Sequence, residues 1–266
     1  MLGDRIIRIL MLLFFFSVPF ISGCVSVPGT GRSQLMLVTP AEERKLGVQE
    51  FEKMKAQIPH GKDQKNQELI RTVGKRIANI APLPDAQWEF VLFDQSKVPN
   101  AFCLPGGKVG IYTGILPITK DDAGMATVMG HEVAHAVARH GAERLSRAML
   151  MAFGGIVLDQ LLQSKSEQTR DMVRAAYGVG GTVGVMLPYS RHNELEADKL
   201  GIMYMAKAGY DPRESIAFWK RFKKFKGSKG GPPEFLSTHP LDDRRIRQLE
   251  AFVPEAMRHY QKAKAG

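Results

Sequence analysis

Two histidines and a glutamate in the stretch from Gly130 to Gly141, GHEVAHAVARHG, have the residue types and the spacing for metal chemistry. His131 and His135 are four positions apart, and on an α-helix such residues share a face, so two imidazoles can bind one ion. Neutral imidazole nitrogens suit Zn²⁺. Glu132 lies about 100° further round the helix, where its carboxylate can act as a general base on a zinc-activated water. The HExxH pattern therefore predicts a hydrolytic zinc site.

The residues around this pattern predict that it lies on a helix. Asp121 or Asp122 can cap the start, and Gly141 is suited to end it. An apolar stripe runs between them and consists of Met125, Val128, Met129, Val133 and Val137. Two histidines that fall at this spacing by chance are the alternative, so the rest of the ligand set has to be found.

The third ligand does not follow directly after HExxH. A catalytic zinc normally has three protein ligands. The metzincin pattern HExxHxxGxxH would place the third one nearby, but Ala138 and Gly141 occupy its Gly and His positions. His140 is out of register for that role. The other solution is a carboxylate from a second helix.

A second predicted helix, which Ser190 can cap and Gly209 can end, carries acids suited to this role. Glu194 and Asp198 are four positions apart and share a face, as a metal ligand and its supporting acid would. Asp198 could accept the free N–H of a ligand histidine and fix its tautomer. A solvated acidic surface would give the same spacing, but the position downstream of HExxH favours a ligand.

Four motifs in order resemble the gluzincin zinc metallopeptidase family of HtpX and the CAAX prenyl-protein endopeptidases, and especially its periplasmic members such as BepA and LoiP. The motifs are NAFCLPGG, HEVAH, SRHNELEADKLG and STHP, and the similarity covers about residues 65 to 253. The resemblance implies an α+β, mostly helical, zincin-like fold. In that fold a small β-hairpin or sheet lies beside the HExxH helix, and a second helix bears a ligand.

The same resemblance implies one Zn²⁺ per chain, bound by His131, His135 and Glu194. It makes Glu132 the catalytic base and Asp198 the acid that supports the ligands.

It also implies roles outside these two helices. The strand at Asn100, Ala101 and Phe102 would be the substrate-binding edge. His239 would approach the zinc, either as a fourth ligand that keeps the enzyme latent or as a hydrogen-bond donor to the oxyanion. Arg245, six residues further on, would help to stabilise charge. A purely structural helix cap at His239 stays an alternative.

Residues 1–23 predict a lipoprotein signal peptide. Two arginines precede an apolar run from Ile9 to Ile21, and the sequence Ile-Ser-Gly-Cys then ends at Cys24. This resembles a lipobox, in which the cysteine becomes the acylated first residue. An uncleaved membrane anchor is the alternative, and both place the body outside the cytoplasm. Val25, where a retention signal would have Asp, favours the outer membrane.

The remaining chain divides into a tether over residues 24–39 and a single zinc metallopeptidase domain over 40–266. The expected elements are helices over 40–57 and 64–81, a strand over Trp88–Phe93 and a hairpin of Ala101–Leu104 with Lys108–Tyr112. The free edge of that hairpin could bind an extended peptide as another strand, although an ordinary structural hairpin explains it as well. Two later apolar segments, Leu145–Leu162 and Met172–Leu187, predict core or membrane-facing elements and not transmembrane helices.

The composition suits a chain that buries one core, with 266 residues, 44% hydrophobic and 24% charged. The net charge of +10 is compatible with nucleic acid. An exported lipoprotein meets little of it, so we expect no nucleic-acid partner and anionic lipid headgroups or acidic polymers as neighbours. Many of the cations lie from Lys220 to Lys229 around Trp219, Phe222 and Phe225, which predicts a solvated helix face with the aromatic rings turned inward.

These features together predict a zinc endopeptidase that cleaves unfolded or misassembled envelope proteins in protein quality control. We expect it to be lipid-anchored at the periplasmic face of the outer membrane. The alternative is a lipid-anchored chaperone or assembly factor with a latent or structural zinc site. A third reading is a basic membrane-surface adaptor that acts through Lys220–Lys229.

Overall fold

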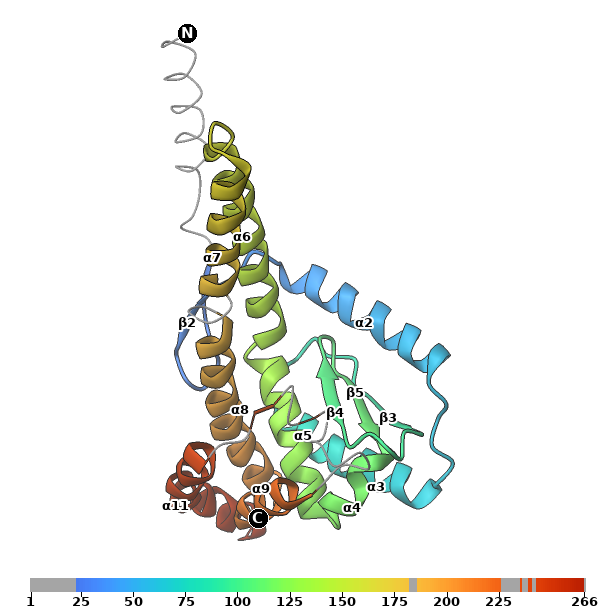
Figure 1. The fold of residues 1–266 in the computed structure, drawn as a ribbon. Helices are drawn as coiled ribbons and strands as arrows, with labels where there is room; N and C mark the ends of the chain where they lie inside the picture. The colour runs from blue at the N-terminus through green and yellow to red at the C-terminus, as the bar shows by residue number, and fades with distance from the viewer. Residues whose placement is uncertain (1–22, 182–185, 226–234, 236–238, 241–242, 266) are drawn as a thin grey trace.

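The computed structural model describes residues 23–181, 186–225, 235, 239–240 and 243–265. The architecture is α+β and mostly helical, as expected, with a small sheet to one side of a set of long helices (Figure 1). In chain order the elements are β1 (Cys24–Ser26), β2 (Ser33–Leu35), α2 (Pro40–Gln57), α3 (Gln64–Ala78), β3 (Glu89–Phe93), β4 (Ala101–Leu104), β5 (Lys108–Tyr112), the 3-10 turn η2 (Thr113–Ile115), α4 (Leu116–Thr119), α5 (Asp122–Val137), α6 (His140–Leu161), α7 (Glu167–Gly181), α8 (Leu187–Lys207), α9 (Arg213–Lys224) and α11 (Asp243–Ala265).

The HExxH helix α5 lies at the centre of the core, in contact with α3, α8, α9 and β4. Its closest approach to α8 is at a pair of glycines. A Cβ on Gly130 would lie 2.8 Å from the carbonyl oxygen of Gly201, and a Cβ on Gly201 would lie 2.8 Å from the backbone nitrogen of His131. Only glycine leaves room for backbones this close. The two helices that carry the expected ligands therefore cross with their main chains nearly in contact.

A side-chain cap begins helix α5, and a left-handed residue follows its last turn. Asp121 caps the start with its carboxylate, as expected. The expectation that Gly141 ends the helix is wrong, because Ala138 is the C-cap and Gly141 lies in the first turn of α6. The chain reverses instead at Arg139, whose φ of 55° is unusual for a residue with a side chain. Its guanidinium donates to Glu43 at 2.6 Å, and this bond holds the strained conformation.

The sheet has the order β3-β5-β4, with β3 parallel and β4 antiparallel to β5. The predicted hairpin is confirmed with the expected bounds, and Gly106 and Gly107 make its turn with φ of 90° and 79°. The other predicted elements differ only at their ends. Helix α3 ends at Ala78 because Pro82 disfavours helix in the residues before it. In this three-stranded sheet β4 is an edge strand.

The segment before α2 is packed against the body. Strands β1 and β2 form an antiparallel pair, and Cys24 is exposed in β1. Val27 and Gln34 are buried, and the Gln34 amide donates to a carbonyl at the end of α5 at 2.8 Å. The Leu37 N–H donates to the Ser146 hydroxyl of α6 at 2.9 Å. The division into a tether and a domain stays a prediction, but much of the expected tether contacts the domain closely.

Helices α6 and α7 lie side by side and project from the body (Figure 1). They contain nearly all of the first apolar segment and residues 172–181 of the second, while residues 182–185 lie outside the described part of the chain and Leu187 begins α8. They are not core elements, since α6 exposes a stripe of apolar side chains. The stripe consists of Leu145, Met149, Phe153 and Ile156. Among the described residues no helix is long and apolar enough to cross a membrane.

Helix α8 begins at Leu187, so Ser190 lies inside it and the expected Ser190 cap is wrong. Its end agrees with the expectation, because Gly209 follows with a φ of 81°.

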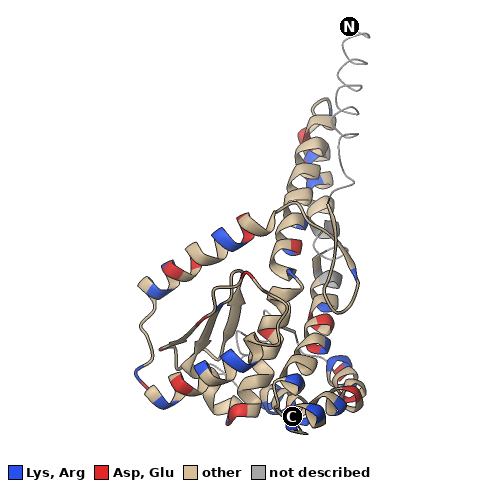
Figure 2. Ribbon diagram, turned by 180° about the vertical axis from the view of Figure 1, so that it is seen from behind, with Lys and Arg blue, Asp and Glu red and all other residues tan. Residues whose placement is uncertain are grey.

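The basic segment of α9 has the predicted orientation. Phe218, Trp219 and Phe222 are buried in the core, while Lys220 and Lys223 are exposed and pair with acids of α11. Figure 2 shows acidic and basic positions interspersed along the outer helices. The last lysines of the cluster, Lys226 and Lys229, lie outside the described residues.

We expect Gly201→Ala to lower the free energy of unfolding by about 1–3 kcal/mol, because the new Cβ has no room against α5. Gly141→Ala is the matched control. It is also a helical glycine, but nothing lies within 4 Å of the added Cβ, and alanine favours a helix by at most about 1 kcal/mol. Urea unfolding of both variants measures the difference. Equal stabilities would contradict a tight crossing.

Candidate active site

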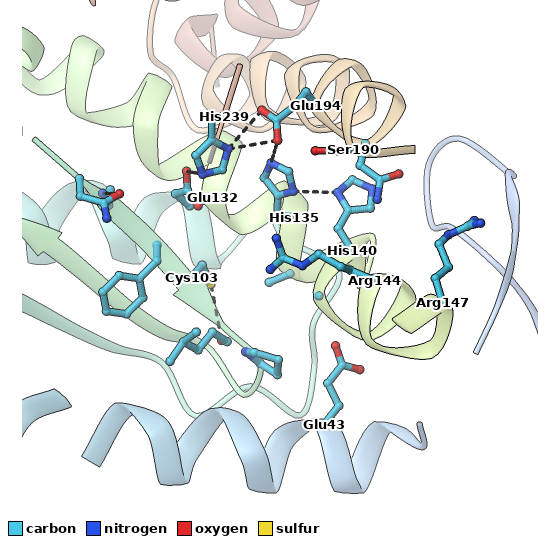
Figure 3. A pocket seen from close by; sticks show the side chains of 18 of the residues that line it. Glu43, Cys103, Glu132, His135, His140, Arg144, Arg147, Ser190, Glu194 and His239 are labelled. Atoms are coloured by element: carbon cyan, nitrogen blue, oxygen red, sulfur yellow. Dashed lines mark hydrogen bonds and ion pairs between the residues drawn. The ribbon is translucent and has the colours of Figure 1, made fainter. Parts of the chain in front are cut away.

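Four side chains from three parts of the chain converge on one point. α5 supplies His131 and His135, α8 supplies Glu194, and His239 comes from the segment before α11. Figure 3 shows His135, Glu194 and His239 turned toward one another. One ligand atom from each can be chosen so that all four lie within 4.8 Å of one another. The Nε2 atoms of the two α5 histidines are 3.1 Å apart, and Nδ1 of His239 is 3.2 Å from Nε2 of His131. The sequence expectation that these residues meet agrees with this geometry.

The donor set and its spacing fit zinc. Four ligands about 2.0–2.1 Å from a tetrahedral ion would lie about 3.3–3.4 Å from one another. Here the Glu194 oxygens lie 3.3 Å from Nε2 of His131, 3.3 Å from Nε2 of His135 and 3.1 Å from Nδ1 of His239. Neutral imidazole nitrogens that face each other repel unless a proton or a cation lies between them. Burial lowers the pKa of His135 well below its ordinary value, which keeps that ring neutral.

Asp198 and Arg245 hold two of these ligands in place. Nδ1 of His131 lies 3.0 Å from Asp198, which also accepts two hydrogen bonds from Arg245 at 2.7 and 2.8 Å. Arg245 in addition lies 3.0 Å from Glu194. Burial alone would raise the pKa of Asp198, but the charge and hydrogen bonds of Arg245 lower it. An ionised Asp198 at this distance favours a proton on Nδ1 of His131, which leaves Nε2 free for a metal.

Glu132 lies beside the cluster and outside the ligand set. Its side chain is buried, and Nε2 of His239 lies 3.6 Å from the Glu132 carboxylate. Burial is the main cause that raises its pKa above the ordinary value. A carboxyl group with a raised pKa holds a proton more readily than an ordinary one, which suits a group that takes up a proton and passes it on.

Aromatic rings wall the cluster on the side of α9. The edge of His131 meets Trp219 with ring centres 5.4 Å apart, and the Arg245 guanidinium lies 4.5 Å from the centre of the same ring. His239 stacks on Phe235 at 4.4 Å. These contacts restrict the ligands and the arginine to single positions.

Two polar residues of this site have no role in the sequence analysis. His140, which is out of register as a ligand, contacts the ligand His135 through Nδ1 atoms 2.8 Å apart. Its other nitrogen lies 3.0 Å from Glu196. The sequence does show a histidine five residues after the second histidine of HExxH. It does not show that this histidine contacts Glu196 on α8, because only the tertiary structure brings the two together.

A cleft of about 300 Å³ lies between the cluster and β4. Asn100, Ala101 and Phe102 line it, so the structure places the predicted substrate-binding strand beside the site. The Tyr112 N–H donates to the Asn100 carbonyl, and the alternation of an antiparallel pair then turns the main-chain groups of Ala101 and Cys103 away from β5. The roles of the metal-binding, catalytic and substrate-binding residues stay predictions.

Comparison with known proteins gives a consistent result. The profile of Peptidase family M48 matches residues 63–253. The mitochondrial metalloendopeptidase OMA1 of Schizosaccharomyces pombe is 36% identical over 187 residues, which are 70% of this chain and 53% of that protein. The human metalloendopeptidase OMA1 is 30% identical over 268 residues, with 97% and 50% covered.

The beta-barrel assembly-enhancing protease of Escherichia coli is 25% identical over 256 residues, with 92% and 52% covered. The chain thus spans about half the length of the curated relatives it matches. The motifs, the zincin-like arrangement of α5 and α8 and the match over most of the chain confirm the expected resemblance, and the chain belongs to peptidase family M48.

Proposed function

We propose that this chain is a zinc-dependent endopeptidase that cleaves unfolded or misassembled proteins of the cell envelope. The observation that carries the proposal is the convergence of two imidazoles and a carboxylate beside the buried Glu132, at the edge of a cleft. His131, His135 and Glu194 would hold the metal. Zinc, when bound there, supplies a Lewis acid that polarises a carbonyl group and makes water more acidic.

The protein groups around the metal divide the remaining work. Glu132 takes a proton from the attacking water and delivers it to the leaving amine, and its raised pKa suits both steps. His239 has one nitrogen among the ligand atoms and the other turned toward Glu132. It is therefore placed either to fill the fourth position or to donate to the oxyanion. Arg245 holds Asp198 and Glu194, which keeps the ligands aligned.

The position of β4 supports an extended substrate. A peptide that adds to the free edge of β4 bonds through its main chain, so binding requires an unfolded stretch more than a particular sequence. The Escherichia coli relative is named for enhancing β-barrel assembly and the OMA1 relatives are named as mitochondrial enzymes. For this chain we propose envelope substrates, acylation at Cys24 and attachment to the periplasmic face of the outer membrane. The exposed apolar stripe of α6 is compatible with a position close to lipid.

A second candidate function is a lipid-anchored chaperone or assembly factor with a latent zinc site. The position of His239 favours it, because a fourth protein ligand is typical of structural zinc sites.

We expect Glu132→Gln to abolish cleavage of an unfolded protein, with a loss of at least about 10²–10⁴-fold, because the amide cannot take a proton. Zinc content should not change, since Glu132 is not a ligand. The measurement pairs cleavage of a reduced, alkylated protein with metal analysis, and Glu50→Gln on the exposed face of α2 is the control. A Glu132→Gln variant as active as the parent would exclude the proposed mechanism.

We expect His239→Ala to retain zinc and to cleave the same substrate faster. If His239 fills the fourth position in about nine-tenths of the molecules, its removal raises the rate about tenfold. Cleavage rate per bound zinc is the quantity to compare. A lower rate in a zinc-loaded variant would instead make His239 a donor to the oxyanion, and the resting site would not be latent.

We expect Cys24→Ser to lose all incorporation of labelled palmitate when the chain is expressed in a Gram-negative bacterium. The serine hydroxyl does not replace the thiol that receives the lipid. Cys103→Ser removes the other cysteine and should keep the label, which makes it the matched control. Label that persists in Cys24→Ser would rule out acylation at this position.

A further inference from the structure

We propose that His140 is a positioning residue for the ligand His135, and that Glu196 and the segment just after Cys24 hold His140 in turn. The packing of this N-terminal segment then helps to set the zinc affinity. The inference rests on the proposed zinc site and extends it to residues that contact neither metal nor substrate.

The hydrogen bonds from His135 to His140 and from His140 to Glu196 are compatible with only one set of histidine tautomers. Nε2 of His135 lies in the ligand cluster, 3.3 Å from Glu194, so a neutral ring that binds metal there carries its proton on Nδ1. That Nδ1 lies 2.8 Å from Nδ1 of His140, which therefore accepts the hydrogen bond (Figure 3). A neutral His140 then carries its own proton on Nε2, which lies 3.0 Å from Glu196 and donates to it. Each contact requires the tautomer that the previous contact sets.

Glu196 is fixed by residues far away in the sequence. It accepts a hydrogen bond from Nε of Arg32 at 2.8 Å and another from the Thr30 hydroxyl. The other end of the Arg32 guanidinium forms two bonds to Glu143 of α6, at 2.8 and 2.9 Å. Both carboxylates are buried. Arg32 thus joins α6 and α8 from a segment that precedes the first helix of the described chain.

The two ligand histidines of α5 therefore have parallel support. Nδ1 of His131 lies 3.0 Å from Asp198, which pairs with Arg245. His135 reaches a carboxylate–arginine pair through one additional imidazole, His140. Loss of such a supporting partner typically weakens metal binding about 10–100-fold, because the ligand ring loses its orientation and its basicity.

The test measures zinc affinity of the full chain by competition with a chromogenic chelator. We expect His140→Leu to weaken zinc binding about 10–100-fold. His140→Asn should recover part of the loss, because its amide oxygen can still accept from His135. Arg32→Met, which leaves all histidines in place, should weaken binding in the same direction by a smaller factor.

Two matched controls should bind zinc as the parent does. His192→Leu removes an exposed histidine of α8. Arg174→Met removes an arginine of α7 that pairs with Asp159 of α6, in the part where these two helices project from the body. Thermal unfolding with and without zinc shows whether each variant is folded and how much zinc stabilises it.

Folded His140→Leu and Arg32→Met variants that bind zinc as tightly as the parent would overturn the inference. So would an unfolding temperature that falls by the same amount with and without zinc, since the network would then serve the fold alone. If the parent itself binds no zinc, the proposed function fails and takes this inference with it. Full cleavage by Glu132→Gln would refute the mechanism and leave the result for His140 intact.

Discussion

The contact of α5 with α8 at Gly130 and Gly201 is the constraint on which the site depends. Two backbones this close bring a carboxylate of one helix within 3.3 Å of both imidazoles of the other. A side chain on either glycine would push the helices apart, and the ligand atoms would separate with them. The residue after Gly130 is His131, an expected ligand, so the helices pack most closely next to the point where the four side chains converge. Stability and site geometry therefore rest on one crossing.

The site also depends on how its buried charged groups are paired. Taking carboxylates and guanidinium groups out of water costs free energy unless every group is paired. Here Asp198 lies between His131 and Arg245, and Glu196 lies between His140 and Arg32. Trp219 of α9 covers one side of His131 and of the Arg245 guanidinium. These pairs hold the side chains of the cluster in place, which is how a preorganised centre is built.

Some contacts that lead to the site lie outside the part of the chain that matches the family. The expected ligands, the catalytic base and Arg245 all lie within residues 63–253, the part that matches the M48 profile. Thr30 and Arg32 lie before it, yet they bond to a carboxylate only two contacts from a ligand. The contacts that lead to His135 therefore extend beyond the segment that matches the family profile.

The sequence by itself determined the parts of this protein that depend on short-range order. The helix that bears HExxH, the bounds of the hairpin and the common face of Glu194 and Asp198 follow from capping, turn residues and helical spacing, which act over a few positions. Tertiary structure decided the rest. Arg139 takes the left-handed position expected of Gly141 because Glu43, 96 residues away, holds it. His140 gains its place beside the ligand from Glu196, 56 residues away. Partners so distant along the chain produce no periodic pattern in the sequence, because only tertiary packing brings them together.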